Sequence, residues 1–275
     1  MAENYGGVLD DRMRDIFDLL RAAPLENVTS ILDVGAGRGE LAVHLAKQGK
    51  KVTCTGVSIG SYVRDIGELR DKYGIEYAEC DVENMPFPQA SFDAVILSHV
   101  LEHCPNVASA LAHVRRVLRE DGLLLVFVPP PEVTVCAGHV SVGWNLGQLM
   151  YVLLLNGFDV KNGNFIEYGY NVCAFVRKSS RPLPQLRHDK GDISLLAKEG
   201  FFPLPVGGDH FDGSIKAVNW PDPSKCARGD LKRRPFKRLL SLILPLGAKI
   251  WLARKLSKLT KFLVRTAPGN STELR

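Results

Sequence analysis

One stretch, residues 31–48 (ILDVGAGRGELAVHLAKQ), restricts the possible fold more than any other part of the chain. It begins with a short apolar run typical of a buried strand, passes three glycines within five residues, and continues with apolar residues at helical spacing. Glycines let a backbone turn sharply and approach a ligand closely. The free N–H groups of a following helix then point at that ligand. The stretch therefore predicts a strand, a ligand-binding loop and a helix, with a plain tight turn as the alternative.

The spacing within this loop distinguishes between classes of ligand. Gly35, Gly37 and Gly39 stand at alternate positions, and Asp33 lies two residues before the first of them. A dinucleotide fingerprint has the different spacing G-x-G-x-x-G, and a P-loop ends in Lys-Ser or Lys-Thr, which this loop lacks. An acidic residue here suits a ligand that carries an amino group and no phosphate.

Strand-like and helical patterns alternate as far as residue 177. Strands are expected at 31–34, 51–57, 75–78, 92–97, 123–128, 158–161 and 170–177, and further helices at 8–21, 61–73, 107–118 and 144–155. This order predicts an α/β fold with a doubly wound, mostly parallel, seven-stranded sheet. The last two strands have no helix between them and are expected to pair antiparallel. Ligands of such sheets bind at the carboxyl ends of strands, where Ser58, Asp81 and Ser98 accompany the glycine loop.

Three regions differ in composition. Residues 1–178 form the expected ligand-binding domain. Residues 179–224 are rich in proline and glycine and predict an irregular segment, either a lid over the substrate or a plain surface wrap. Residues 225–275 form a basic tail. The six cysteines show no metal-ligand spacing, and the chain begins without an apolar signal core, which together favour buried thiols, no metal site and a cytoplasmic location.

The tail concentrates the positive charge of the chain. Residues 225–265 contain thirteen Lys and Arg residues and one acidic residue, whereas the whole chain has a net charge of only +5. Within 231–266, leucines recur at helical spacing opposite the basic residues, and a proline and a glycine interrupt the first apolar run. We expect a basic amphipathic helix on an anionic membrane surface. A helix docked on the domain or on a second subunit is the alternative, and nucleic acid is the less favoured partner because the apolar face is large.

Residues 28–177 together resemble the class I S-adenosylmethionine-dependent methyltransferases, in particular their broad branch acting on small molecules and glycans. The resemblance is carried by ILDVGAGRGELAVHLAKQG, by ECDVENMPFPQASFDAVILSHVLEHCPN, by LAHVRRVLREDGLLLVFVPP and by GHVSVGWNLGQLMYVLLLNGFDV. It implies a Rossmann-like fold and S-adenosylmethionine as the cofactor. It does not identify the methyl acceptor.

The resemblance also implies roles for individual residues. Residues of the glycine loop would line the methionine part of the cofactor: Asp33, Gly35, Ala36, Gly37 and Gly39. Asp81 would accept from the adenine amine beside Val82, although an aspartate that caps the loop is the alternative. Ser98 and His99 would lie near the sulfonium.

One position departs from the family pattern. The second strand usually ends in an acidic residue that accepts from the ribose hydroxyls, and here it ends in Ser58. A hydroxyl accepts less strongly than a carboxylate. This departure leaves open weaker cofactor binding, compensation by Asp65 or Glu68, or a protein that binds the cofactor without turnover.

Three histidines lie where the acceptor is expected. His99 and His103 are four residues apart and would share a face if that segment were helical, and His139 follows the fifth strand. A zinc site is disfavoured because the His-Glu-x-x-His order and a third ligand are missing. Histidine suits general-base catalysis on a hydroxyl acceptor. We therefore favour His139, and then His103, as the base.

These features predict a methyltransferase at the cytoplasmic membrane surface that O-methylates a sugar or a lipid-linked glycan. The alternatives are methylation of a quinone-like or other lipophilic small molecule, and a non-catalytic cofactor-binding scaffold. The sequence leaves the oligomeric state open.

Overall fold

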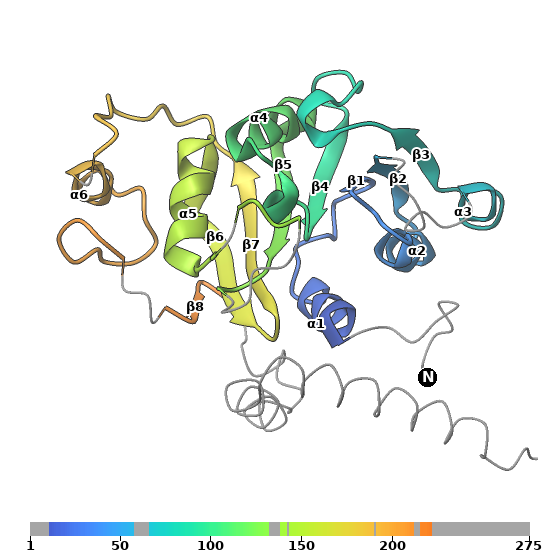
Figure 1. Cartoon of the computed structure of the whole chain (residues 1–275), viewed down its shortest axis with the longest axis horizontal. Helices are drawn as coiled ribbons and strands as arrows, with labels where there is room; N and C mark the ends of the chain where they lie inside the picture. Colours follow the sequence, from blue (N-terminus) through green and yellow to red (C-terminus); the bar gives the residue numbers. More distant parts are fainter. Residues whose placement is uncertain are drawn as a thin grey trace, which may run out of the picture. The chain divides into compact units, whose positions relative to one another are not determined.

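A single eight-stranded sheet, with the order β3-β2-β1-β4-β5-β7-β6-β8, lies at the centre of the computed structural model (Figure 1). The structure describes residues 11–57, 66–131, 138–141, 143–189, 191–211 and 215–221. The strands are β1 (Ser30–Val34), β2 (Lys51–Gly56), β3 (Glu76–Glu79), β4 (Phe92–Ser98), β5 (Leu118–Val128), β6 (Phe158–Tyr168), β7 (Asn171–Lys178) and β8 (Ala217–Val218). The first five are parallel to one another, whereas β7 is antiparallel to both β5 and β6. The Rossmann-like, mostly parallel sheet is therefore confirmed.

Helices cover both faces of this sheet. They are α1 (Asp11–Leu20), α2 (Glu40–Lys47), α3 (Ile66–Tyr73), α4 (Val107–Val117), α5 (Leu146–Leu155) and α6 (Gly191–Lys198), with 3₁₀ turns η2 (Val82–Asn84) and η3 (Leu101–His103). Side chains of a strand point alternately to opposite faces. Leu32 accordingly joins the core under α4 and α5, and its neighbour Ile31 joins the core under α1 and α2. Strands buried on both faces explain the continuous apolar runs of the sequence.

The order of strands reverses at β1, because the chain goes outward to β2 and β3 and then returns to β4 on the other side. Such a reversal opens a crevice at the carboxyl ends of the two central strands. Val34 pairs with Leu97 in register, so the glycine loop and the turn after β4 leave the sheet side by side. The fold therefore brings two stretches of the chain, near residues 35 and 99, to one place.

Two expectations about the later part of the chain are wrong. The sheet has eight strands, not seven, because Ala217 and Val218 pair with β6, which itself extends to Tyr168 through a bulge. Residues 179–224 are not wholly irregular, because α6 lies within them and buries Leu196. The Asp192 carboxylate accepts from the N–H groups of Arg187 and His188 before this helix.

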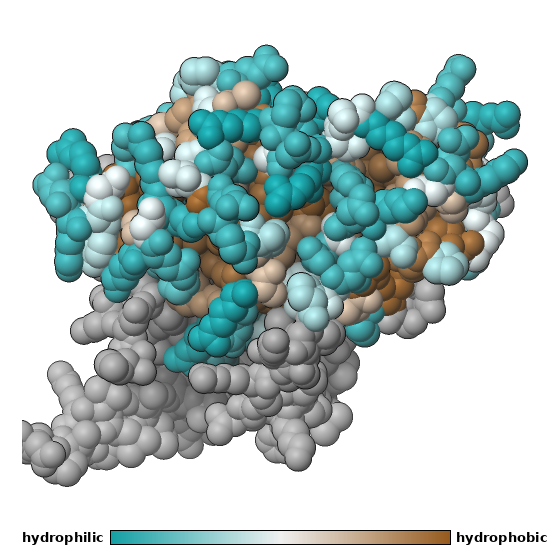
Figure 2. Space-filling view, turned by 180° about the vertical axis from the view of Figure 1, so that it is seen from behind, coloured by the Kyte–Doolittle hydropathy of each residue, from teal (hydrophilic) through white to brown (hydrophobic). Residues whose placement is uncertain are grey.

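No helix in the described ranges is long and apolar enough to cross a membrane. Figure 2 shows one face of the molecule, on which hydrophilic side chains dominate and hydrophobic ones lie between them. The predicted amphipathic helix at 231–266 lies outside the described residues, as do residues 8–10 of the first expected helix, residues 61–65 of the next and Ser58.

Candidate functional site

The glycine loop after β1 is held in the left-handed backbone region. Gly35, Gly37 and Gly39 have φ angles of 66°, 54° and 75°. A Cβ atom added at Gly35 would lie 2.8 Å from Cγ2 of Val100, whereas one added at Gly37 would meet nothing within 4 Å. Gly35 therefore permits the loop to pack against the turn after β4, and Gly37 borders open space.

Asp33 places a buried carboxyl group under this loop. Its side chain is 1% exposed, and Oδ2 has no hydrogen-bond partner among the described residues. Burial, and secondarily the charge of Glu40, raise the pKa of Asp33 to about 7. An unpartnered buried carboxylate is costly, so this group favours either a proton or a bound cation. Open space at Gly37 and an unpartnered oxygen at Asp33 fit a ligand that carries an ammonium group.

The predicted adenine side of the site lies at the end of β3. Asp81 is exposed and caps η2, because its Oδ1 accepts from the backbone N–H of Glu83 at 2.8 Å. Val82 is buried at 8% exposure. The capping geometry is thus present, and a contact of Asp81 with adenine stays a prediction.

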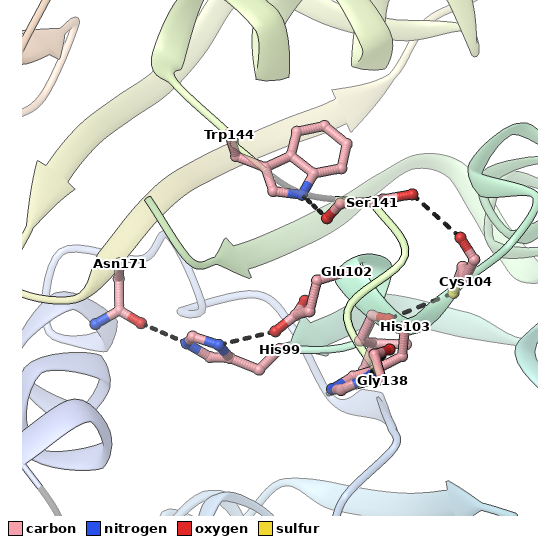
Figure 3. A network of polar contacts seen from close by, with 9 residues as sticks. His99, Glu102, His103, Cys104, Gly138, Ser141, Trp144 and Asn171 are labelled. Carbon is pink, nitrogen blue, oxygen red and sulfur yellow. Dashed lines mark hydrogen bonds and ion pairs between the residues drawn. The ribbon is translucent and has the colours of Figure 1, made fainter. Parts of the chain in front are cut away.

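The turn after β4 is built around His99, which follows Ser98 at the end of the strand. His99 has a φ of 56°, a left-handed conformation that is strained for a residue with a side chain. Its Nδ1 lies 2.9 Å from Oε1 of Glu102, and its Nε2 lies 3.0 Å from Oδ1 of Asn171 (Figure 3). The ring also stacks on Tyr170, with centroids 6.0 Å apart. These contacts fix the imidazole and connect β4 to β7.

The segment from His99 to His103 is not one helix, so the two histidines do not share a helical face. His99 is in the left-handed region, and only Leu101–His103 form a short 3₁₀ turn. The structure pairs His103 with His139 instead, with ring centroids 4.8 Å apart. Both favoured base candidates therefore lie at the same place.

A short segment, 138–141, is fastened to η3 and thereby positions His139. The backbone N–H groups of Val140 and Ser141 donate to the Glu102 carbonyl at 2.8 and 3.1 Å. The Ser141 hydroxyl donates to the Cys104 carbonyl at 3.2 Å (Figure 3). These bonds bring together residues that are far apart in the sequence.

Glu102 is the site residue that sequence reasoning missed. Its side chain is fully buried, Oε1 faces His99, and Oε2 has no partner in the part of the chain that the structure describes. Glu102 stands between Leu101 and His103, and no pattern in this part of the sequence indicates that its side chain is buried. Only the packing of segment 138–141 over η3 shows it.

A groove of about 360 Å³ runs between the first turn of α4 and the length of α5. It is lined by Val107, Ala108, Ser141, Trp144, Gln148, Val152, Leu155 and Asn156. Apolar atoms predominate in this lining, and Ser141 connects one end of it to the segment that carries His139.

Comparison with known proteins gives consistent matches. A methyltransferase-domain family model matches residues 32–126. A ubiquinone/menaquinone biosynthesis C-methyltransferase UbiE from Bartonella quintana is 30% identical over 238 residues, covering 80% of this chain and 84% of that protein. A highly reducing polyketide synthase gloL from Glarea lozoyensis is 29% identical over 132 residues, covering 43% of this chain and only 5% of the synthase.

A solved structure shows the same fold. The 1,6-didemethyltoxoflavin-N1-methyltransferase of Burkholderia thailandensis, with bound 1,6-didemethyltoxoflavin and S-adenosylhomocysteine, superposes with a TM-score of 0.50 and 21% identity. The match covers 62% of this chain and 78% of that one. Together with the family model and the long UbiE match, this fold agrees with the resemblance seen in the sequence. The chain therefore belongs to the class I S-adenosylmethionine-dependent methyltransferases.

Proposed function

We propose that this enzyme methylates a small lipophilic acceptor of the quinone class. The observation that carries the proposal is the length of the UbiE match, which takes in 80% of the chain, whereas the methyltransferase-domain model ends at residue 126. The similarity thus continues past the cofactor half of the fold. The predicted O-methylation of a sugar or lipid-linked glycan is the competing proposal, and no contact among the described residues favours it.

The groove beside α5 supports a lipophilic acceptor. Its apolar lining suits a hydrocarbon or aromatic group, and Gln148 and Asn156 supply a few polar contacts, a combination typical of small-molecule sites. Ser141 lies at the groove and two residues beyond His139. An acceptor lying in the groove would therefore have one end near the histidine pair.

We assign the cofactor to residues at the carboxyl ends of the strands, around the crevice where the strand order reverses. Asp33, Gly35, Ala36, Gly37 and Gly39 would hold its amino-acid part, with Asp33 facing the ammonium group. Asp81 and Val82 would hold adenine, Ser58 the ribose, and Ser98 and His99 would lie beside the sulfonium.

In methyl transfer, the main task of the protein is to align the acceptor with the methyl group of the cofactor. The cofactor supplies an activated methyl group when bound, so the chain's task is to hold the acceptor in line with it and to exclude water. An acceptor hydroxyl or ring carbon also loses a proton. His139, and then His103, would take up that proton, since both lie on the acceptor side.

We also infer a cytoplasmic enzyme that works at the membrane surface through residues 231–266. A lipophilic acceptor would reside in that membrane. Thirteen basic residues within 225–265 would attract anionic lipid headgroups.

The test is the destination of a labelled methyl group. The purified full chain is incubated with S-adenosylmethionine carrying a labelled methyl and with an extract of cells lacking the protein, and the products are separated into organic-extractable lipid and glycan. We expect label in the lipid fraction, and in a demethylated quinol added alone. Label confined to glycan would support the competing proposal. Cofactor binding with no label transfer to any fraction would indicate a scaffold. The Gly37→Val variant, which should not bind cofactor, is the control.

A further inference from the structure

Three potential metal ligands converge beside the turn after β4. A carboxylate oxygen of Glu102, a ring nitrogen of His103 and a ring nitrogen of His139 all lie within 4.8 Å of one another. We propose that these three side chains bind a divalent transition-metal ion. The sequence disfavours a metal site because it shows no third ligand beside the two neighbouring histidines. His139 joins Glu102 and His103 only because segment 138–141 folds onto η3.

A hydrogen bond orients His103 as a ligand. Nδ1 of His103 lies 3.0 Å from the carbonyl oxygen of Gly138, and a carbonyl only accepts, so Nδ1 carries the hydrogen. The lone pair of this ring is therefore on Nε2. A metal-binding histidine commonly donates its other N–H to a backbone carbonyl, which fixes the tautomer and the ring.

Glu102 supplies the second, independent observation. Its side chain is fully buried, and Oε2 has no hydrogen-bond partner among the described residues. Its other oxygen is held by His99 at 2.9 Å, as ligating carboxylates are commonly held by an outer partner. A bound cation would satisfy the free oxygen and offset the cost of burying the charge.

The donor set indicates the class of ion. Two imidazoles and one carboxylate suit Zn²⁺ and neighbouring transition-metal ions, whereas Mg²⁺ and Ca²⁺ prefer oxygen ligands. With bonds of about 2.0–2.1 Å, the ligand atoms of a tetrahedral zinc ion lie roughly 3.4 Å apart. An ion would thus draw the three side chains somewhat closer, which exposed His103 and half-buried His139 have room to do.

Three protein ligands leave a coordination position open, as in catalytic zinc sites. The cluster itself is not closed off, because His103 is exposed. The functional consequence rests on the proposed function: the ion would hold an acceptor oxygen in its ionised form. The two histidines would then act through the ion, and not as free bases.

The test measures ion binding without any acceptor, so its outcome is independent of the acceptor class. The full chain, freed of metal by chelator, is titrated with Co²⁺ and Zn²⁺ by calorimetry, and the visible spectrum of the Co²⁺ form is recorded. Variants Glu102→Gln, His103→Ala and His139→Ala are compared with His210→Ala, which removes an exposed imidazole outside the cluster. Circular dichroism and S-adenosylhomocysteine affinity show whether each variant remains folded.

We expect each of the three variants to lose at least roughly 10- to 100-fold in Co²⁺ affinity, the range found even for outer-shell changes, while His210→Ala binds as the wild type does. The Co²⁺ spectrum should show nitrogen and oxygen ligands and no thiolate charge-transfer band. A thiolate band would overturn the proposal in favour of a cysteine such as Cys104, the neighbour of His103. Absence of binding by the wild type, or equal binding by all variants, would also overturn it.

Discussion

The protonation state of Asp33 should control cofactor affinity. Without ligand, burial holds the pKa of this carboxyl near 7, so about half of the molecules carry a neutral Asp33 at neutral pH. A cationic ammonium beside the group favours its ionised form and lowers its pKa. Binding then releases a proton, and affinity must rise as the pH increases through 7 and level off above it.

The size of this effect follows from the pKa. If only ionised Asp33 binds the ammonium, affinity falls tenfold for each pH unit below 7, because one unit corresponds to about 1.4 kcal/mol. Between pH 7.5 and pH 5.5 the loss should approach roughly 2 kcal/mol, or about 25-fold. Asp33→Asn keeps the shape of the side chain but removes the charge. It should bind weakly at every pH and show no slope.

Calorimetry with S-adenosylhomocysteine, in buffers of different ionisation enthalpy, measures both the affinity and the number of protons released. We expect close to one proton released at pH 6 and close to none at pH 8.5 for the wild type, and none at pH 6 for Asp33→Asn. An identical pH slope in the variant would assign the titration to another group. A flat wild-type profile between pH 5.5 and 8 would refute a charge contact between Asp33 and the ligand.

The remaining predictions concern the same half of the molecule and the tail. Gly37→Ala should lose cofactor affinity strongly. The control is Gly74→Ala, because Gly74 also has a positive φ and an added Cβ there also meets nothing within 4 Å; this variant should lose only about 1–2 kcal/mol of unfolding free energy and keep its cofactor affinity. Equal cofactor affinities of the two variants, measured by calorimetry, would contradict the assignment of Gly37 to the ligand. Ser58→Asp should tighten binding by about 1 kcal/mol if it restores a ribose acceptor, and weaker binding would mean that another residue holds the ribose. Without ligand, Asp33→Asn should stabilise the fold at pH 8 by up to roughly 4 kcal/mol and have little effect near pH 3. The reason is that ionising the buried Asp33 costs stability, and this cost grows as the pH rises from about 4, where the unfolded chain ionises, to 7, the folded-state pKa. Thermal denaturation at both pH values checks the sign. A chain ending at Ser224 should bind cofactor normally and lose salt-sensitive sedimentation with anionic liposomes, and equal sedimentation of the two chains would remove the tail from membrane binding.

The glycine-loop half of the fold could be predicted because its strand, loop and helix are each determined by residues close together in the sequence. The strand at 31–34 and the glycines after it are read directly from side-chain type and spacing, and β1 ends at Val34 as expected. Helix α6 was missed for the opposite reason. Ile193, Leu196 and Ala197 have helical spacing, but they lie in a segment rich in prolines and glycines. Composition averaged over residues 179–224 concealed one short amphipathic helix.

The proposed acceptor side could be predicted only in part, because its contacts join distant parts of the chain. His99 meets Asn171 across 72 positions of sequence, and His103 meets Gly138 across 35. Spacing along a helix suggested the partnership of His99 with His103, and the left-handed turn at His99 prevents it. No sequence pattern encodes that turn, because a positive φ is uncommon for any residue other than glycine, including histidine, which is enriched among the exceptions.

That strained turn also explains how the two halves of the site are connected. His99 has an unfavourable backbone conformation, and this conformation places its two ring nitrogens within hydrogen-bond distance of Glu102 and Asn171. Val100, the next residue, packs on Gly35, where any larger side chain would collide with it. One residue, Val100, therefore connects the glycine loop to His99, and the imidazole of His99 contacts the buried carboxylate of Glu102. Gly35, a proposed cofactor residue, is in this way joined by direct contacts to His99 and Glu102, which lie on the proposed acceptor side.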